Sequence, residues 1–395
     1  MNILMVSALD IKDKGAQSLK KTIEGYLTRR HKVFFISYKK GPKEPDYFYE
    51  DGEKLSRENF FYYNVVLPFP FLDKNFYTRK IRLSLLFPIF VFLKARKIIS
   101  EKKINLLYGY EVQGVISCSL IKKINKIPIV SRFQGTIMHP LLKNNKIPVK
   151  YYDHIFALKY PSDLVIMAND GTFGDDVLER LGVSISKVKF WRNGVANYLF
   201  NPKYKNWIRS NYSIGEDTKI LLTLSRLVHW KRVDRAIKAL KYISKEAKAV
   251  LFIIGDGPEK EALELLVKSE GVDDRAIFVG SVEHKEVYKF LNSCDLFLSL
   301  YDLSNLGNPV MEAMSCGKCV LAIDHGEMSE IIEDSRTGFL VNGEEKVGEK
   351  LLDVLQNESL MMEVGKTAID FSKKNYWTWE ERMDAEIKEV ENIVK

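Results

Sequence analysis

A turn of small residues that leads into a helix is the part of the sequence best suited to hold a phosphate. An apolar run over residues 295–300 reads as a buried strand, and the turn Ser304-Asn305-Leu306-Gly307-Asn308-Pro309 follows it. A helix predicted from Val310 onward would offer free backbone N–H groups and the positive end of its dipole. The alternative is an ordinary α/β turn, because glycine and proline are common in such places. Glu312, one turn inside the helix, could reach a neutral group beyond the phosphates, such as a ribose hydroxyl.

Two basic residues predict a second part of the same site. Arg226 follows a predicted strand over residues 219–225, and Lys231 stands five residues later at the entry of the next helix. Both positions lie at the carboxyl edge of the predicted sheet, so we expect them to converge on one point. A guanidinium fork and an ammonium point charge together suit a diphosphate leaving group. The alternative is a pair of unrelated surface cations.

Four blocks of the sequence resemble a known family. The segment S-N-L-G-N-P-V-M-E-A-M-S-C-G-K, residues 304–318, resembles the signature of family 4 glycosyltransferases, which are retaining enzymes of GT-B fold that use nucleotide-diphosphate sugars. The Arg-x-x-x-x-Lys block at residues 226–231, the G-D-G-P block at 255–258 and the N-G-V block at 193–195 are similar to the family in the same order. The match covers most of the chain and is densest in its second half.

The resemblance implies roles for individual residues. Arg226, Lys231 and the backbone amides of Leu306 to Val310 would take the negative charge that develops on the departing nucleoside diphosphate, and Glu312 would hold the ribose. Gly15, after the first strand, would approach the donor, and the loop that contains Val282 would lie against the base. The substrate-binding residues implied in the turn are Leu306, Gly307, Asn308, Pro309, Val310 and Asn305.

Two positions on the sugar side depart from the family pattern. The family has two glutamates separated by seven residues; the second is Glu312, whereas the first position is Ser304. A strand that usually ends in His-Gly ends here in Gln134-Gly135. Serine and glutamine can hydrogen-bond a hydroxyl but carry no charge near neutral pH. Asp302 could supply the missing carboxylate and His139 the missing imidazole, although a lone surface histidine is the simpler interpretation. We therefore predict a changed sugar or acceptor preference with donor binding retained, and the candidate catalytic residues are Ser304, Glu312, Gln134 and Asp302.

The chain is long enough for two domains. Its 395 residues alternate predicted strands and helices, which indicates an α/β fold with doubly wound sheets. The resemblance implies two Rossmann-like domains that face each other across a cleft, with a last helix that crosses back to the first domain. We expect an acceptor-binding domain over residues 1–197, with residues 376–395 packed on it, and a donor-binding domain over residues 198–375. We also expect one long helix over residues 344–366.

The positive charge is concentrated in the first half of the chain. Residues 1–200 hold 33 Lys and Arg residues and 18 Asp and Glu residues, whereas the remainder holds 27 and 34. Such a field favours anionic partners, including a phospholipid surface, and the alternative is a lysine-rich surface that serves solubility. The apolar run at residues 83–93 has basic residues on both sides and is too short to span a bilayer. It reads either as an interfacial segment that contacts the membrane or as a core helix.

The cysteines give no support for a metal or redox site. Cys316 and Cys319 form a C-x-x-C pair, but no second pair completes a zinc site. We therefore expect no metal and no cofactor, since the nucleotide-diphosphate sugar is a substrate. Four cysteines and no signal peptide fit a cytoplasmic protein, peripheral on the membrane if residues 83–93 contact lipid.

The predicted function is a retaining glycosyltransferase. It would move a hexose-type sugar from a nucleotide-diphosphate sugar to a glycan, lipid-linked or glycolipid acceptor, as in the synthesis of a surface polysaccharide. One alternative is a nucleotide-sugar-binding regulatory protein that has lost transfer, and another is a GT-B nucleotide-sugar epimerase. Nucleic acid is not expected as a partner, because no recognition module is visible.

Overall fold

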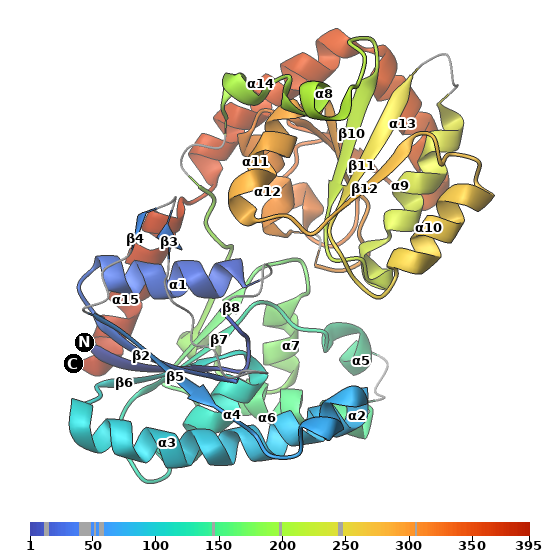
Figure 1. Ribbon diagram of the computed structural model, residues 1–395. Coiled ribbons are helices and arrows are strands. Elements are labelled where there is room, and N and C mark those ends of the chain that lie inside the picture. The colour runs from blue at the N-terminus through green and yellow to red at the C-terminus, as the bar shows by residue number, and fades with distance from the viewer. Residues whose placement is uncertain are drawn as a thin grey trace. The chain divides into compact units, whose positions relative to one another are not determined.

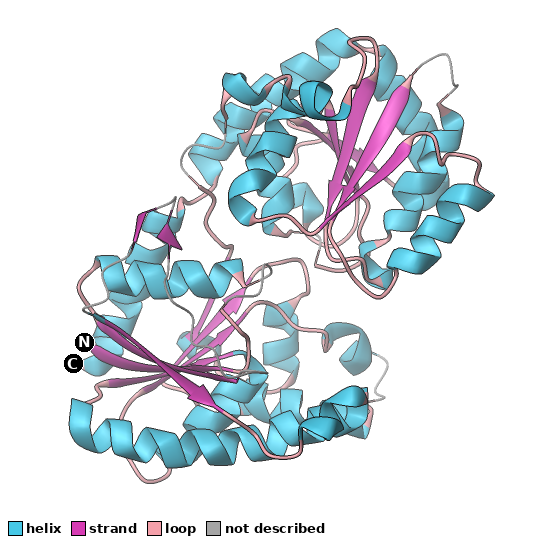
Figure 2. Ribbon diagram, in the orientation of Figure 1, coloured by secondary structure: helices cyan, strands magenta, loops and turns pink. Residues whose placement is uncertain are grey.

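The computed structural model describes residues 1–11, 16–38, 49–50, 53–54, 59–143, 147–196, 200–243, 248–304 and 306–395. The chain divides into two compact units. Unit 1 consists of Met1–Asn169, Phe173–Asn193 and Trp379–Lys395, and unit 2 consists of Asp170–Thr172 and Gly194–Thr378. Figure 1 and Figure 2 show that each unit is a sheet covered by helices on both faces.

Unit 1 is built on a parallel sheet with the strand order β5-β2-β1-β6-β7-β8-β9. Its strands are runs of apolar residues because both faces are buried. In β1 (Asn2–Ser7), Ile3 and Met5 join the core beneath α1 and α15, whereas Leu4 and Val6 join the core beneath α3 and α4. The sheet order reverses direction beside β1, where β2 lies on one side and β6 on the other.

The other strands of unit 1 are β2 (Lys32–Tyr38), β5 (Phe60–Val65), β6 (Leu106–Tyr110), β7 (Ile129–Phe133), β8 (Leu164–Ala168) and β9 (Val188–Trp191), with a small β3 (Tyr49–Glu50) and β4 (Glu53–Lys54) pair. Its helices are α1 (Gln17–Thr28), α2 (Phe76–Ile81), α3 (Phe87–Lys102), α4 (Glu111–Lys122), α5 (His139–Lys143), α6 (Tyr152–Lys159), α7 (Gly174–Arg180) and α15 (Trp379–Val394). A π-helical turn, Arg82–Leu86, joins α2 to α3.

Helix α15, the last of the chain, is fastened to unit 1 by a buried ionic cluster. Glu386 is fully buried and accepts hydrogen bonds from the hydroxyls of Tyr108, at 2.5 Å, and Tyr26, at 3.2 Å. Arg382, one turn earlier, pairs with Glu386 at 3.1 Å and stacks on the Trp191 ring. Burial and the nearby Arg132 lower the pKa of Arg382 to about 10, so the arginine stays charged at neutral pH. The Glu386 carboxylate also interacts electrostatically with the fully buried Arg132, so two buried guanidinium groups depend on it.

Unit 2 is a second parallel sheet, with the order β12-β11-β10-β13-β14-β15. Its strands are β10 (Lys219–Leu224), β11 (Ala249–Ile254), β12 (Ala276–Gly280), β13 (Leu296–Ser299), β14 (Cys319–Ile323) and β15 (Phe339–Val341). Its helices are α8 (Trp207–Tyr212), α9 (Val233–Ala239), α10 (Lys260–Ser269), α11 (His284–Ser293), α12 (Asn308–Ser315), α13 (Val347–Gln356) and α14 (Glu358–Asn375).

The single helix expected over residues 344–366 was wrong. The structure has two helices, α13 and α14, because Asn357 leaves the helical conformation and its side chain caps α14 by accepting from the Leu360 amide.

Among the described residues, none of the helices has both the length and the apolar character needed to cross a membrane.

The buried cluster on α15 gives a stability prediction. Glu386→Gln removes the carboxylate that two buried arginines share, so we expect the free energy of unfolding to fall by about 3–5 kcal/mol. Glu389→Gln on the same helix is the control, because Glu389 pairs with Lys189 in a half-exposed ion pair and should cost less than about 1 kcal/mol. Urea denaturation of both variants measures the difference, and equal losses would contradict the role given to Glu386.

Candidate active site

The strand order of unit 2 brings two loops to one place. β10 has β11 on one side and β13 on the other, so the direction in which successive strands are added to the parallel sheet reverses between β10 and β13. Loops that follow the strands on each side of such a reversal diverge and leave room for a ligand. The loop after β10 carries Arg226 and Lys231, and the loop after β13 carries Asp302, Ser304 and the start of α12. The two cations and the small-residue turn therefore lie at the same edge of the same sheet.

Direct contacts join these two loops. The Lys231 ammonium donates to the Ser304 carbonyl oxygen at 2.5 Å and lies 4.5 Å above the Tyr301 ring. The Tyr301 hydroxyl donates to the Leu224 carbonyl at the end of β10, and the Asp302 amide donates to the Trp230 carbonyl. Lys231 is thereby held across the reversal point.

The charge of Lys231 is only partly balanced by the protein. Burial lowers the pKa of Lys231 to about 8; the Asp170 carboxylate opposes this shift and the Arg226 guanidinium adds to it. Arg226 is exposed and near enough to repel Lys231 electrostatically. An anion bound between the two cations would raise the pKa of Lys231 again. This arrangement suits a diphosphate.

The G-D-G-P turn supports the loop that carries Arg226. The Leu227 amide donates to the Asp256 carbonyl, and the Glu259 amide donates to the Leu227 carbonyl, both at 3.0 Å. Gly255 has a φ of +137°, and a Cβ placed there would lie 1.8 Å from the Ser225 carbonyl oxygen. Only glycine allows the ends of β10 and β11 to approach so closely.

Some of the backbone amides predicted to bind a phosphate already donate hydrogen bonds within the protein. The Leu306 amide donates to the Asp170 carbonyl oxygen at 3.1 Å, the Val310 amide donates to the Gly307 carbonyl at 3.2 Å, and Pro309 has no N–H. Within the described residues, the amides of Gly307 and Asn308 at the N-terminus of α12 donate to no protein acceptor. These two amides are the donors that remain for an anion.

Glu312 lies inside α12 with a partner that the sequence did not reveal. Its side chain is 3% exposed, and its Oε1 lies 2.9 Å from Nε2 of His284, the first residue of α11. His284 is more accessible, at 29% side-chain exposure. A buried carboxylate that is oriented by an imidazole is well placed to accept a hydrogen bond from a ligand hydroxyl. Val282, in the same β12–α11 loop, is half-buried and packs against the core.

Ser304 is paired with a carboxylate from another segment. Its φ of +54° is unusual for a residue with a side chain, and its hydroxyl is hydrogen-bonded to Asp170. Asp170 also accepts from the Thr172 hydroxyl at 2.5 Å, and burial raises the pKa of this carboxyl group. The carboxylate beside position 304 is therefore Asp170, which follows β8 in the chain.

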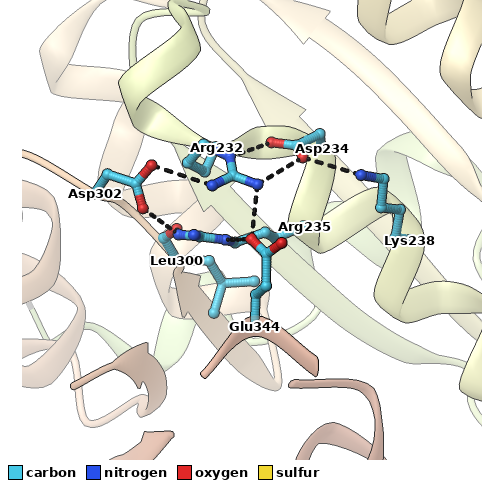
Figure 3. Close-up of polar contacts among 7 residues, drawn as sticks. All are labelled: Arg232, Asp234, Arg235, Lys238, Leu300, Asp302 and Glu344. Atoms are coloured by element: carbon cyan, nitrogen blue, oxygen red, sulfur yellow. Dashed lines mark hydrogen bonds and ion pairs between the residues drawn. The ribbon is translucent and has the colours of Figure 1, made fainter. Parts of the chain in front are cut away.

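Asp302 is committed to a network of ion pairs, drawn in Figure 3. One carboxylate oxygen pairs with Arg232 at 3.1 Å and the other with Arg235 at 2.6 Å. Both arginines also contact Glu344, and Arg235 donates to the Leu300 carbonyl. Arg232 further pairs with Asp234, which Lys238 also contacts. The network fixes the loop after β13 against α9. In this network, the Asp302 carboxylate holds the loop in position.

The two sugar-side residues predicted in unit 1 have separate surroundings. The Gln134 amide nitrogen and oxygen are both satisfied when the oxygen accepts from the Tyr110 hydroxyl at 2.9 Å and from Arg132 at 3.1 Å. Its backbone amide donates to the Glu111 carboxylate. His139 stacks on the Phe173 ring and lies 3.5 Å from Asp176 of α7. The remaining predicted residues, Gly15 and Asn305, lie outside the described part of the chain.

All four cysteines are buried and free of disulfides. Burial raises the pKa of the Cys319 thiol to about 12, which leaves little thiolate near neutral pH. Within the residues that the structure describes, no cluster of three or more His, Cys, Asp or Glu side chains is placed to hold a metal ion.

Three residues of this site were missed by sequence reasoning: Asp170, His284 and Arg232. An acidic residue two positions after β8 and a histidine four positions after β12 are signals of position, because both follow the carboxyl ends of strands. Neither signal identifies the partner, since the contacts join segments far apart in the chain.

Comparison with solved structures defines the fold class. The structure of Anabaena HepE in complex with UDP and glucose superposes with a TM-score of 0.76, at 16% identity, and the match covers 99% of both chains. The fold is GT-B. The fold class predicted from the sequence is confirmed in its two Rossmann-like sheets and in its last helix, α15, which packs on unit 1.

Comparison of sequences gives the family. Residues 205–371 match the family Glycosyl transferases group 1. The N-acetyl-alpha-D-glucosaminyl L-malate synthase of Bacillus anthracis is 32% identical over 163 residues, which are 41% of this chain and 42% of that protein. The sulfoquinovosyl transferase SQD2 of Arabidopsis thaliana is 28% identical over 280 residues, which are 68% and 52%. The chain spans about half the length of these curated relatives.

The lowered pKa of Lys231 predicts how nucleotide binding depends on pH. A diphosphate binds the protonated ammonium, so affinity should be full below pH 8 and fall as pH rises through about 8. Between pH 7 and pH 9 the affinity for a free nucleoside diphosphate should fall about tenfold, measured by isothermal titration calorimetry. Asp170→Asn removes the carboxylate that raises the pKa of Lys231, so the fall should move to lower pH.

The control for this experiment is Asp370→Asn, an exposed position on α14. It should leave the pH profile of the wild type unchanged. An affinity that stays constant from pH 7 to pH 9 in the wild type would show that Lys231 does not bind the diphosphate.

Proposed function

We propose that this protein is a retaining glycosyltransferase that moves a hexose-type sugar from a nucleotide-diphosphate sugar to a glycan, lipid-linked or glycolipid acceptor. The observation that carries the proposal is the buried Lys231 ammonium, which is held between the β10 and β13 loops with Arg226 nearby and the N-terminus of α12 following the same turn. The match of residues 205–371 to the family Glycosyl transferases group 1 and the names of the two sequence relatives, both of which describe sugar-transfer or sugar-linking enzymes, support this function.

The donor's diphosphate would occupy the space at the reversal point of the unit 2 sheet. Lys231 and Arg226 would neutralise the charge that develops as the sugar–phosphate bond breaks, and the amides of Gly307 and Asn308 would hydrogen-bond the phosphate oxygens. Glu312, oriented by His284, would accept from a ribose hydroxyl. Because protein cations and amides supply the positive charge, we propose that the reaction needs no metal ion and no cofactor.

The sugar side of the reaction would depend on hydrogen bonding more than on ionisable groups. Gln134 and Ser304 are neutral, and the carboxylate nearest to Ser304 is Asp170. Asp302 is neutralised by two arginines, so we assign it to positioning of the loop after β13. We further propose that the protein works in the cytoplasm, at or near the membrane face, and the positive charge of its first half supports this location.

A turnover assay tests the reaction class. The purified protein is incubated with each nucleotide-diphosphate sugar, with and without an acceptor extract, and released nucleoside diphosphate is measured. A transferase releases the diphosphate only with acceptor, and NMR of the product shows an anomeric configuration equal to that of the donor. Saturable binding without turnover would favour a regulatory protein. A changed sugar without acceptor would favour an epimerase, and either result would overturn the proposal.

Lys231→Ala is the variant that tests the diphosphate site. Loss of one charge-assisted hydrogen-bond donor should weaken nucleoside diphosphate binding by about 10- to 150-fold and remove turnover, while the fold is retained. Lys238→Ala is the matched control, because Lys238 lies on the adjacent helix and pairs only at the surface with Asp234. If Lys231→Ala bound the nucleoside diphosphate as tightly as the wild type, the assignment of the diphosphate site to Lys231 would be wrong.

A further inference from the structure

An exposed apolar stripe runs along one helical segment of unit 1. Ile81, Leu85, Ile89 and Leu93 are spaced four residues apart and are 59%, 61%, 49% and 57% exposed. The opposite side of the same segment is core, where Phe87, Val91 and Ala95 are fully buried beneath the sheet. The segment is thus apolar on both its inner and its outer side. In Figure 1, α2 and α3 run along the lower edge of this unit.

The π-helical turn keeps this stripe in one line. In a regular α-helix, positions four residues apart rotate by about 40° at each step, so a stripe with this spacing would wind around the axis. The wider turn at Arg82–Leu86 advances less per residue and takes back part of that rotation. The four exposed side chains therefore stay on one face over about 18 Å.

A neighbouring loop adds two aromatic rings beside the beginning of the stripe. Phe69 and Phe71 are 54% and 63% exposed, and their ring centroids are 6.0 Å apart. Phe69 has a φ of +61°, which is rare for a bulky residue and requires support from its surroundings. Arg82, buried within the π-helical turn, provides that support, because its guanidinium donates to the carbonyls of Leu67 and Pro68.

Helix α6 adds apolar residues on another side. Tyr152 and Phe156 are 57% and 49% exposed. Asp153, between them in sequence, fixes α6 to the stripe, since its carboxylate pairs with Lys80 at 3.1 Å and accepts from Ser84 at 3.0 Å. The loop, the stripe and α6 are therefore connected by buried or half-buried polar contacts, and each presents apolar side chains to solvent. We call the exposed side chains of the stripe and the loop the apolar face: Phe69, Phe71, Ile81, Leu85, Ile89 and Leu93.

The charges within residues 74–100 have one sign, and two acidic residues nearby, Asp73 and Asp153, are paired with Arg82 and Lys80. Residues 74–100 contain no Asp or Glu and seven basic residues: Lys74, Arg79, Lys80, Arg82, Lys94, Arg96 and Lys97. Lys74 and Arg79 are exposed at one end of the segment, and Lys94, Arg96 and Lys97 at the other. Protein interfaces are depleted in lysine, whereas apolar and aromatic residues with a lysine and arginine border match an anionic lipid surface.

We propose that the apolar face docks on an anionic phospholipid bilayer. The aliphatic and aromatic side chains would enter the interfacial layer, and the basic residues at both ends would contact headgroup phosphates. The docking surface goes beyond the proposed reaction, and it holds whether or not the chain transfers a sugar. It would bring unit 1 to the surface on which a lipid-linked acceptor resides.

Co-sedimentation with vesicles tests this surface. The full chain is mixed with vesicles of phosphatidylglycerol and phosphatidylcholine, or of phosphatidylcholine alone, at low and high salt. We expect binding to the anionic vesicles that weakens with salt. Ile81→Ser with Leu85→Ser should reduce the partition coefficient about tenfold or more, because two apolar side chains no longer enter lipid. Lys94→Gln with Arg96→Gln and Lys97→Gln should abolish the preference for anionic vesicles.

The matched control is Leu265→Ser with Met362→Ser, which removes two apolar side chains of 66% and 69% exposure from unit 2. It should bind vesicles as the wild type does. Ile89→Ser with Leu93→Ser repeats the test farther along the stripe in case the first pair impairs folding. Nucleoside diphosphate affinity, measured on every variant, reports on the donor site separately from the docking surface.

Two results would overturn the proposal. One is vesicle binding that is absent in the wild type or equal in the wild type and both stripe variants. The other is self-association that the stripe variants abolish while no lipid is bound, which would assign the apolar face to contact between two copies of the chain.

Discussion

The desolvated ammonium of Lys231 is the constraint on which the proposed donor site depends. An ammonium that leaves water must find compensation, and the protein supplies only part of it: one carbonyl oxygen, one aromatic face and the Asp170 carboxylate. The lowered pKa of Lys231 reflects this incomplete compensation. A diphosphate bound against Lys231 and Arg226 would complete it, and the free energy gained in this way would add to the affinity for the ligand.

The structure around Lys231 serves to keep this group in place. Arg232 and Arg235 bind both oxygens of Asp302, which fixes the loop after β13 against α9, as Figure 3 shows. On the other side, Gly255 lets the G-D-G-P turn lie directly under the loop that carries Arg226. Preorganisation of this kind allows cations to stabilise developing charge without rearrangement during the reaction.

The features that could be predicted from the sequence were those that depend on local residue patterns. Apolar runs, glycine turns and the spacing of Arg226, Lys231 and Glu312 were sufficient for the doubly wound sheets and for the placement of a candidate diphosphate site at their carboxyl edge. Contacts between distant segments could not be predicted: Asp170 beside Ser304, His284 beside Glu312, and Arg382 with Glu386 all join parts of the chain through folding. The break at Asn357 was missed because one capping side chain overrides a continuous helical pattern. For residues 83–93, the sequence could not decide between a core helix and a segment that contacts lipid. The spacing of apolar residues alone does not show that both sides of one helix are apolar.

The most direct test of the central claim is a thermal-shift screen of the purified chain with UDP, GDP, ADP and dTDP sugars and with the free nucleoside diphosphates. A ligand that binds the folded state alone raises the melting temperature. Our account predicts that one nucleotide series stabilises the protein, that its free diphosphate retains much of the effect, and that Lys231→Ala abolishes it. An equal shift in the wild type and in Lys231→Ala, or no shift with any nucleotide, would contradict the claim that this site holds the donor diphosphate.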